Sequence, residues 1–348
     1  MPGPEPTAAP GSVGQPELTI VFLAYQQEAF VGEAVRSILA QDGVVAEIIL
    51  SDDASSDGTF RAMLAAAAGY RGPHQVMVRR NKVNQGIDHI VQLVELAHCD
   101  AMVMAHGDDL SEPNRCRRLL DEMRRTGADV VSSNYLEIDT AGRPMGLNTD
   151  DDPTDGCTAE EIAISGWRRS MFGATLAWRR AVYTRFPRLD AQYLPIGHDT
   201  LVPFRGALLG GMRYVNEPLL RYRRHAGQWQ HVLHDHRARE TWEESQYSAA
   251  VMPRLAMARD LEHLLSQDTL PAAERHRLAA LHTTVRENIL ALTAEWVQVR
   301  QRLYRQGWRP TWVSRQEFGK TGRIHGLGVL REAARNSFRR WRWQLFHL

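Results

Sequence analysis

Two adjacent carboxylates, Asp108 and Asp109, stand shortly after the apolar run Ala101–Ala105. Carboxylate oxygens suit hard divalent cations, and Mg²⁺ is usually held by one or two carboxylates together with substrate phosphates. The pair can therefore hold Mg²⁺ or Mn²⁺ at the end of a strand. An Asp-Asp pair in this position is also a common turn or helix N-cap, so the rest of the chain must decide between the two interpretations.

A second acidic cluster opens the polar segment Ser51–Thr59, which follows another short apolar run and begins with Asp52 and Asp53. The same segment has the composition of a capped helix start, with Asp57 or Thr59 as the cap. The two roles are compatible, because a helix can begin beside a binding site.

The hydrophobic pattern predicts the scaffold that these acids need. The expected strands are 18–24, 47–50, 76–78 and 101–105, and the expected helices are 28–40, 59–68 and 87–97. This alternation implies a mostly parallel sheet with right-handed crossovers and with helices on both faces. Ligands of such sheets bind at the carboxyl ends of the strands, where both acidic clusters fall.

Beyond the paired acids the pattern becomes more varied. The expected elements are a helix over 113–125, strands over 129–133 and 172–177, helices over 179–186 and 198–209, and a closing pair of strands over 212–215 and 219–222. We interpret residues 140–160 as a loop whose acidic patch, 150–155, could be a lid ordered by a ligand. Residues 237–300 have helical periodicity broken near Pro253 and Pro271, which predicts a separate region of two or three helices.

The charge of the chain is unevenly distributed. A net charge of +1 over 348 residues argues against a general nucleic-acid binder. Residues 300–348, however, carry twelve Lys or Arg and two Glu, a net charge of +10. Trp308, Trp312, Trp341 and Trp343 are interleaved with these charges, which suits a segment resting on anionic lipid. A basic helix packed on the acidic remainder, or an oligomer contact, is the alternative.

The cysteines and the N-terminus indicate the compartment. The three cysteines have no metal-ligand spacing, which favours a reducing environment. The first residues are rich in Pro, Gly and Ala, without the basic and apolar regions of a signal peptide. No run of about 18 apolar residues occurs. We expect a cytoplasmic protein that could lie peripherally on the inner face of the cell membrane.

Four motifs occur in a recognisable order. They are Ala24–Glu28, Ser51–Thr59, Gly107-Asp108-Asp109 with Pro113 shortly after, and His198-Asp199 followed by Glu217–His225. In this order, residues 18–225 resemble the family 2 glycosyltransferases of GT-A fold, the inverting, nucleotide-sugar-dependent enzymes of bacterial polysaccharide synthesis. The metal motif of that family often begins with Asp where this chain has His106, and its catalytic Asp often follows Glu where this chain has His198.

The resemblance implies a nucleotide-sugar site at the carboxyl ends of the first strands. Its expected residues are Ala24, Tyr25, Glu28, Asp52, Asp53, Asn84, Gly86 and Asp108. Asp52 or Asp53 would read the base or ribose, and a carboxylate that accepts from uracil N3–H is chemically sensible. Tyr25 and Glu28 could equally form an ordinary helix start, and the segment with Asn84 could be a plain turn. Asp109 would contact the metal, with Asp108 on the ribose or as a second metal contact.

The resemblance also assigns the catalytic step. Inversion at an anomeric carbon needs a general base for the attacking hydroxyl, and Asp199 is implied in that role; the alternative is a helix N-cap. His198 would orient Asp199 or touch the acceptor, and His225 would approach the metal or the diphosphate. Arg221 and Arg223 could bind phosphate, since Arg is its natural bidentate partner, or form a solvated strand end.

These inferences predict the organisation and the function of the whole chain. We expect a disordered lead over 1–16, a GT-A catalytic domain over 17–230 divided near 110, a helical region over 231–300 and a basic tail over 301–348. The catalytic domain would transfer a sugar from a nucleotide diphosphate, with UDP preferred, to a glycan or lipid-linked acceptor. The helical region could support a homodimer. The alternatives are a non-catalytic binding subunit of the same fold, or a nucleotidyltransferase, which would usually have a Gly-rich basic loop after the first strand.

Overall fold

The computed structural model describes residues 14–148, 155–165, 171–189, 198–226 and 239–305. The basic tail beyond residue 305 and the acidic patch, apart from Asp155, lie outside these residues, as does the lead before residue 14. No helix in the described part of the chain is both long enough and apolar enough to cross a membrane.

A single mixed sheet forms the centre of the described structure. Its strands are β1 (Leu18–Ala24), β2 (Ala46–Asp52), β3 (Gln75–Arg80), β4 (Ala101–His106), β5 (Leu110–Ser111), β6 (Val130–Ile138), β7 (Pro144–Leu147), β8 (Ala177–Arg179) and β9 (Met212–Arg223). They follow the order β3-β2-β1-β4-β8-β6-β9-β5, and β7 pairs with β6. The first four strands are parallel, as predicted, while β8 runs antiparallel to both β4 and β6.

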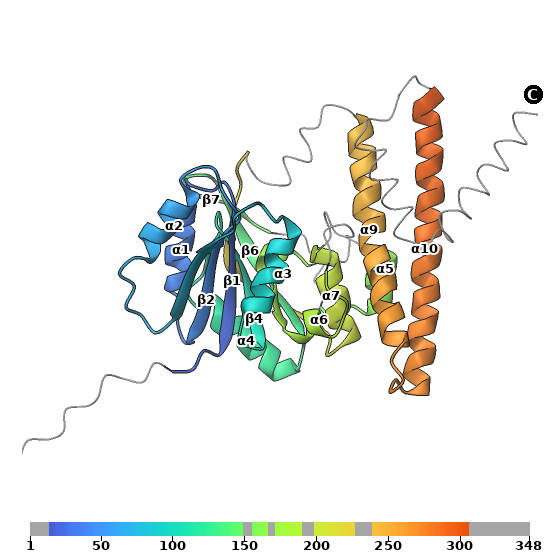
Figure 1. Cartoon of the computed structure of the whole chain (residues 1–348), viewed down its shortest axis with the longest axis horizontal. Coiled ribbons are helices and arrows are strands. Elements are labelled where there is room, and N and C mark those ends of the chain that lie inside the picture. Colours follow the sequence, from blue (N-terminus) through green and yellow to red (C-terminus); the bar gives the residue numbers. More distant parts are fainter. Residues whose placement is uncertain (1–13, 149–154, 166–170, 190–197, 227–238, 306–348) are drawn as a thin grey trace, which may run out of the picture.

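Helices cover both faces of this sheet (Figure 1). The helices of the described residues are α1 (Val31–Leu39), α2 (Thr59–Ala67), α3 (Ile87–Leu96), α4 (Arg115–Thr126), α5 (Ala159–Ser165), α6 (Ala181–Thr184), α7 (His198–Leu208), α9 (Arg239–Leu265) and α10 (Ala272–Arg305). The last two stand beside the sheet, next to α5 and α7, and do not cover it (Figure 1). Successive β1 side chains point to opposite faces: Ile20 packs into the core under α1 and α4, and Val21 into the core under α3. Burial on both faces explains why β1 is apolar throughout.

Two predicted elements of the second half are wrong. Instead of a strand over 172–177, a short 3-10 turn, η2 (Gly173–Thr175), leads into β8. Instead of two closing strands, β9 is one strand whose register against β6 shifts near Pro218. The segment Glu217-Pro218 has the composition of a turn. A bulge tolerates a proline, which has no N–H, because no backbone donor is needed at that position of the ladder.

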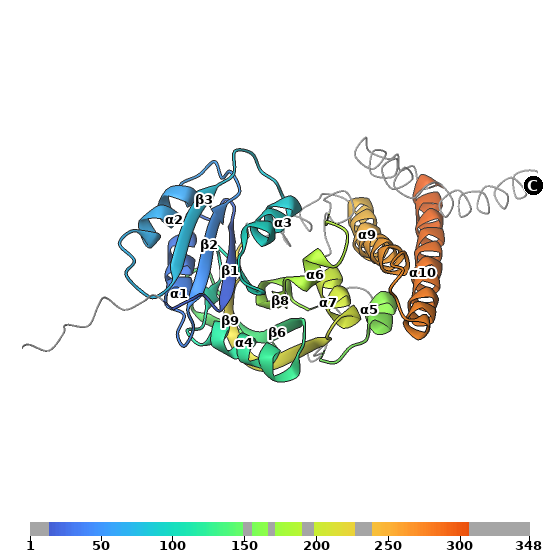
Figure 2. The same ribbon diagram turned by 60° about the horizontal axis from the view of Figure 1, so that its bottom comes forward.

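The expected loop over 140–160 and the expected helix breaks also need correction. The segment contains β7, which forms a hairpin with β6, and the beginning of α5. Pro253 lies inside α9 without ending it, whereas the break near Pro271 occurs as predicted. The two resulting helices run side by side in both views (Figures 1 and 2).

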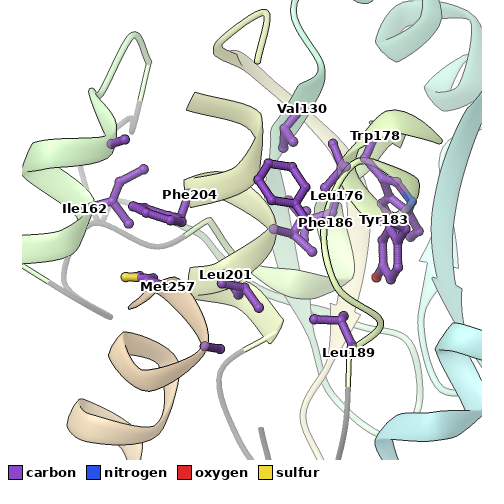
Figure 3. Close-up of a cluster of buried hydrophobic side chains, with 14 of the residues drawn as sticks. Val130, Ile162, Leu176, Trp178, Tyr183, Phe186, Leu189, Leu201, Phe204 and Met257 are labelled. Atoms are coloured by element: carbon purple, nitrogen blue, oxygen red, sulfur yellow. The ribbon is translucent and has the colours of Figure 1, made fainter. Parts of the chain in front are cut away.

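The α9–α10 hairpin shares a hydrophobic core with the second half of the sheet. Leu201 and Phe204 of α7 lie in the same cluster as Met257 of α9 and Ile162 of α5 (Figure 3). Beside this cluster, Arg205 of α7 and Asp260 of α9 form an ion pair in which both side chains are 2% exposed. The hairpin is therefore fixed directly to α7, the helix that begins at His198.

Candidate active site

The paired acids lie in a tight turn between β4 and β5. Gly107 opens the turn, and its N–H donates to the Leu23 carbonyl at 2.9 Å. A Cβ at Gly107 would lie 3.0 Å from the Ala24 Cβ and would overlap the Gln27 side-chain oxygen. The glycine thus lets the acidic turn lie against the opening turn after β1, where the first sequence motif is found.

Asp108 and Asp109 face different partners. Oδ2 of Asp108 lies 3.0 Å from Nε2 of His225, while Oδ1 of Asp109 accepts from the Arg223 N–H at 3.0 Å. Burial would raise the pKa of Asp108, but the His225 hydrogen bond and the nearby imidazoles lower it. Burial raises the pKa of Asp109, which is 4% exposed. Asp108 is therefore the acid held as an anion beside His225. Asp109 is the buried acid that accepts a hydrogen bond from the β9 backbone.

Arg223 braces the acidic turn from inside the protein. Its side chain is 1% exposed, and Nε donates to the Asp108 carbonyl at 2.9 Å. Nη1 donates to the carbonyls of Asp139 and Thr140, and Nη2 contacts Glu33 at 2.7 Å. A guanidinium occupied in this way supports the turn; it does not lie open to a phosphate.

The other arginine predicted for phosphate, Arg221, forms a partly exposed ion pair with Glu112 at 2.6 Å. Arg221 and Arg223 are two positions apart on β9 and so lie on the same face of the strand, but Arg221 contacts Glu112 whereas Arg223 contacts Asp108 and Asp109. The structure therefore brings Arg223, but not Arg221, against the Asp108–Asp109 turn.

The acids at the end of β2 are both buried and already hydrogen-bonded. Asp52 accepts from the N–H and hydroxyl of Ser55 and pairs with Arg80 at 3.0 Å. Asp53 accepts from the Asn81 amide at 2.7 Å and from the N–H groups of Gln85 and Gly86 at 2.9 and 3.0 Å. Asp53 thus holds the loop between β3 and α3.

That loop contains Asn84 and Gly86, which the sequence assigned to the nucleotide site. The Asn84 side-chain oxygen accepts from the Gly86 N–H at 3.1 Å, and Gly86 has a left-handed φ of 55° immediately before α3. The loop is therefore shaped by Asp53 and lies directly after the carboxyl end of β3. Glycine at position 86 is required because other residues adopt this φ at a steric cost.

A buried histidine, His89, lies behind this loop, and no sequence motif predicted it. His89 of α3 is 2% exposed; its Nε2 lies 2.7 Å from the Ser51 hydroxyl, and its Nδ1 lies 3.9 Å from Asp53. Burial lowers the pKa of His89 to about 4, although the neighbouring carboxylates oppose this. The imidazole is therefore neutral at pH 7 and completes the polar network under Asp53.

The opening turn borders the same region. Tyr25 is 48% exposed, and the Ala24 carbonyl accepts from the Asp53 N–H at 2.9 Å. The Glu28 carboxylate accepts from the Gly58 N–H at 2.9 Å, at the start of α2. Glu28 therefore supports the α2 terminus, and the exposed ring of Tyr25 remains accessible beside the carboxyl end of β1.

Asp199 lies in the first turn of α7, and its side chain is half exposed. His198 points the other way: its side chain is 9% exposed, its Nε2 is hydrogen-bonded to the Tyr183 hydroxyl, and its Nδ1 lies 3.9 Å from Asp199. Tyr183 packs beside Trp178 in the core (Figure 3). His198 therefore anchors the start of α7 inside the protein, while Asp199 faces outward.

The acids of the β4–β5 turn and of α7 both influence the pKa of His106. The protein around the His106 ring would lower its pKa, but the charges of Asp109, Asp108 and Asp199 raise it. The His106 Nδ1 lies 3.7 Å from Asp109. Carboxylates from the β4–β5 turn and from α7 thus both contribute to the electrostatic environment of His106.

The described residues contain no group of three or more His, Cys, Asp or Glu arranged to hold a metal ion. The pair formed by Asp108 and His225 nevertheless fits the chemistry of a Mg²⁺ or Mn²⁺ site that is completed by substrate. A carboxylate and an imidazole supply two donors, and diphosphate oxygens and water can supply the others. The chain's own residues therefore fit a metal that is held jointly with a nucleotide.

The comparisons with known proteins agree with the fold and with the order of the sequence motifs. The model of glycosyl transferase family 2 matches residues 19–186, and this segment is similar to that family. TarS of Staphylococcus aureus, solved in complex with UDP-GlcNAc, shares the fold with a TM-score of 0.53 at 15% sequence identity, over 81% of each chain. The architecture is thus the GT-A fold.

Each of these curated relatives matches only part of the chain. The succinoglycan biosynthesis protein ExoO of Rhizobium meliloti is 28% identical over 37% of this chain and 36% of its own length. EpsE of Bacillus subtilis, a glycosyltransferase by name, is 33% identical over 36% of this chain and 46% of its own. An uncharacterized protein of Mycobacterium bovis, Mb1547, is 26% identical over 65% of this chain and 64% of its own. The chain thus spans less than half of the first two relatives.

Proposed function

We propose that this chain is an inverting, metal-assisted glycosyltransferase that moves a sugar from a nucleotide diphosphate to a hydroxyl of a glycan or lipid-linked acceptor. The observation that carries the proposal is a pair of unlike acidic groups whose charges both act on His106: Asp108 beside His225, and the half-exposed Asp199 on α7. The first suits a metal and a diphosphate, and the second suits a base on the acceptor side.

In this mechanism Asp108 and His225 would hold Mg²⁺ or Mn²⁺, which as a Lewis acid would neutralise the charge of the departing diphosphate. Asp109 would stay in the interior with Arg223 and keep the turn in shape. Asp199 would accept the proton of the attacking hydroxyl as the sugar transfers. Because Asp52 and Asp53 are occupied by protein groups, they would shape the base pocket through the loop that Asp53 holds, with Tyr25 beside it.

The donor and the biological setting extend the same proposal. UDP-sugars are the first donors to test, because TarS, which shares the fold, was solved with UDP-GlcNAc. Surface polysaccharide synthesis is the proposed setting, because ExoO is named for succinoglycan biosynthesis. The cytoplasmic location, the contact of the basic tail with anionic lipid and a dimer through the helical region stay predictions.

The test combines nucleotide binding with turnover. Purified protein would be incubated with Mn²⁺ or Mg²⁺ and a panel of nucleotide sugars, and nucleoside diphosphate release would be measured with and without EDTA. Asp108→Ala should weaken binding of UDP with Mn²⁺ in calorimetry. Asp199→Asn should keep that binding and lower turnover by about 10²- to 10⁴-fold, the usual contribution of a general base.

The control is Asp121→Asn, an acid on α4 that is 48% exposed and paired with Arg117. It should change neither binding nor turnover. If nucleotides bind in a metal-dependent way but no donor is turned over with any acceptor extract, the chain is a binding subunit of the same fold. If Asp199→Asn turns over like the unmodified protein, the proposed base is wrong.

A further inference from the structure

The η2 turn comes unusually close to the acid on α7. A Cβ built on Gly173 would lie 2.8 Å from the carboxylate carbon of Asp199, 3.0 Å from its Oδ2 and closer still to its Oδ1. Gly173 is not among the glycines with a positive φ, so its backbone conformation suits any residue. Position 173 therefore excludes a side chain because Asp199 occupies the space, and not because of backbone strain.

The η2 turn is held to the rest of the fold by hydrogen bonds to α4 and to β4. Arg115 of α4, fully buried, donates to the Ala174 carbonyl at 2.7 Å and to the Ser111 hydroxyl at 2.9 Å. The Leu176 carbonyl accepts from the Met104 N–H at 2.9 Å, which ties the end of the turn to β4. The same β4 leads into the acidic turn, so η2 is fixed relative to the proposed metal site.

An aromatic cluster supports the start of the turn. Phe172 packs edge-on against Tyr222 with 4.8 Å between ring centroids and stacks on Tyr135 at 4.7 Å. By contrast, the Asp199 side chain is half exposed. If a side chain appeared at position 173, the carboxylate would move before the turn did.

We propose that Gly173 is a positioning residue for Asp199. Because position 173 has no side chain, the Asp199 carboxylate can occupy the space beside the η2 turn and point toward the attacking hydroxyl. This inference rests on the proposed function, in which Asp199 is the base. A base must lie within about 2.6–3.2 Å of the oxygen whose proton it removes, so its position is narrowly defined. Gly173 sets that position without touching substrate.

The size of the effect follows from the geometry. Non-bonded carbon atoms are at their optimum at about 3.5–4.0 Å, so alanine would displace the carboxylate, whose carbon would lie 2.8 Å from the new Cβ, by roughly 1 Å. A misplacement of about 1 Å in a catalytic group can lower a rate about 10²-fold. Because an exposed carboxylate can move cheaply, the folded state itself should hardly be affected.

The experiment compares Gly173→Ala with Gly146→Ala, since a Cβ at Gly146 on β7 would meet no atom within 4 Å. Four quantities would be measured: kcat, KM for the donor, the Kd of UDP with Mn²⁺, and Tm. Gly173→Ala should lower kcat about 10²-fold with Kd and Tm unchanged, and Gly146→Ala should change none of the four. Unchanged kcat in Gly173→Ala would overturn the inference, and so would a Tm loss large enough to explain a lower kcat.

A double variant separates this inference from the proposed function. In the Asp199→Asn background, Gly173→Ala should cause no further loss of kcat, because its effect passes through the carboxylate. Full additivity of the two losses would overturn the positioning role while leaving the base in place. If Asp199→Asn alone left kcat unchanged, the proposed function would fail first, whatever Gly173→Ala did.

Discussion

Replacing Asp260 with leucine should destabilise the protein severely. The carboxylate pairs with Arg205 through two contacts, 2.6 Å to Nε and 2.8 Å to Nη2, and both side chains are 2% exposed. Arg205 also donates to the carbonyls of Val182 and Pro187. Asp260→Leu would therefore leave a guanidinium buried beside apolar side chains without its counter-ion.

The expected magnitude follows from this burial. Breaking a buried ion pair by removing one partner typically costs about 3–5 kcal/mol, because the remaining charge stays desolvated. The pair Arg277–Glu160, which also joins the helical hairpin to the rest of the protein, is 42% and 41% exposed. Glu160→Gln should therefore cost at most about 1 kcal/mol. The double variant Arg205→Met, Asp260→Leu should recover part of the larger loss, since no charge remains buried.

Urea unfolding followed by circular dichroism would measure the three variants, with the midpoint converted to free energy through a common slope. Turnover of the nucleotide sugar should fall together with stability in Asp260→Leu, because Arg205 lies on α7, the helix whose first turn contains Asp199. Equal losses in Asp260→Leu and Glu160→Gln would refute the reasoning, since they would show that the buried pair is solvated like the exposed one.

Three further changes test the residues around the nucleotide site. His89 has a pKa of about 4 in the folded state against its usual 6.5, so the unfolded state takes up the proton first as the pH falls. The free energy of unfolding should therefore drop by up to about 3 kcal/mol between pH 6.5 and pH 4. Urea midpoints across this range should show that His89→Gln lacks this pH-dependent loss. Arg223→Lys should lose about 2–4 kcal/mol of stability and weaken UDP binding in calorimetry, whereas Arg221→Lys should change both little. Asp53→Asn should turn an amide N–H₂ toward the N–H groups of Gln85 and Gly86, and hydrogen exchange should show these amides exchanging faster.

The parallel half of the sheet is predicted well from the sequence because strands buried on both faces appear as short continuous apolar runs. Strands covered on both faces, such as β1 and β2, consist of continuous apolar or buried residues, and the acids begin where the strands end. The prediction for the second half of the chain is wrong where the tertiary structure overrides local composition. Pro218 looks like a turn but lies in a bulge of β9, and Pro253 looks like a helix break but lies inside α9.

The same division applies to the candidate site. Motif order draws attention to Asp108, Asp109 and Asp199, although it assigns the metal to Asp109 and not to Asp108, and the roles of all three stay predictions. Arg115, His89 and Gly173 could not be found in this way, because each matters through a partner that is distant in sequence. The partner of Gly173, for example, is Asp199, and nothing in the local sequence Phe172–Thr175 shows that a carboxylate lies against it.

The different environments of Asp108 and Asp109 explain how two adjacent carboxylates can share one buried turn. Two anions side by side repel each other, so one of them needs strong support from cations or hydrogen-bond donors. Asp108 has His225, and the charge of Asp109 is felt by Arg115, whose buried guanidinium has its pKa lowered by desolvation to about 10. Arg115 also holds the η2 turn, so the cation that helps to keep the acidic turn in the interior is the residue that fixes Gly173 against Asp199. Arg115 thus links the η2 turn to the surroundings of the acidic turn, which Arg223 and His225 contact directly.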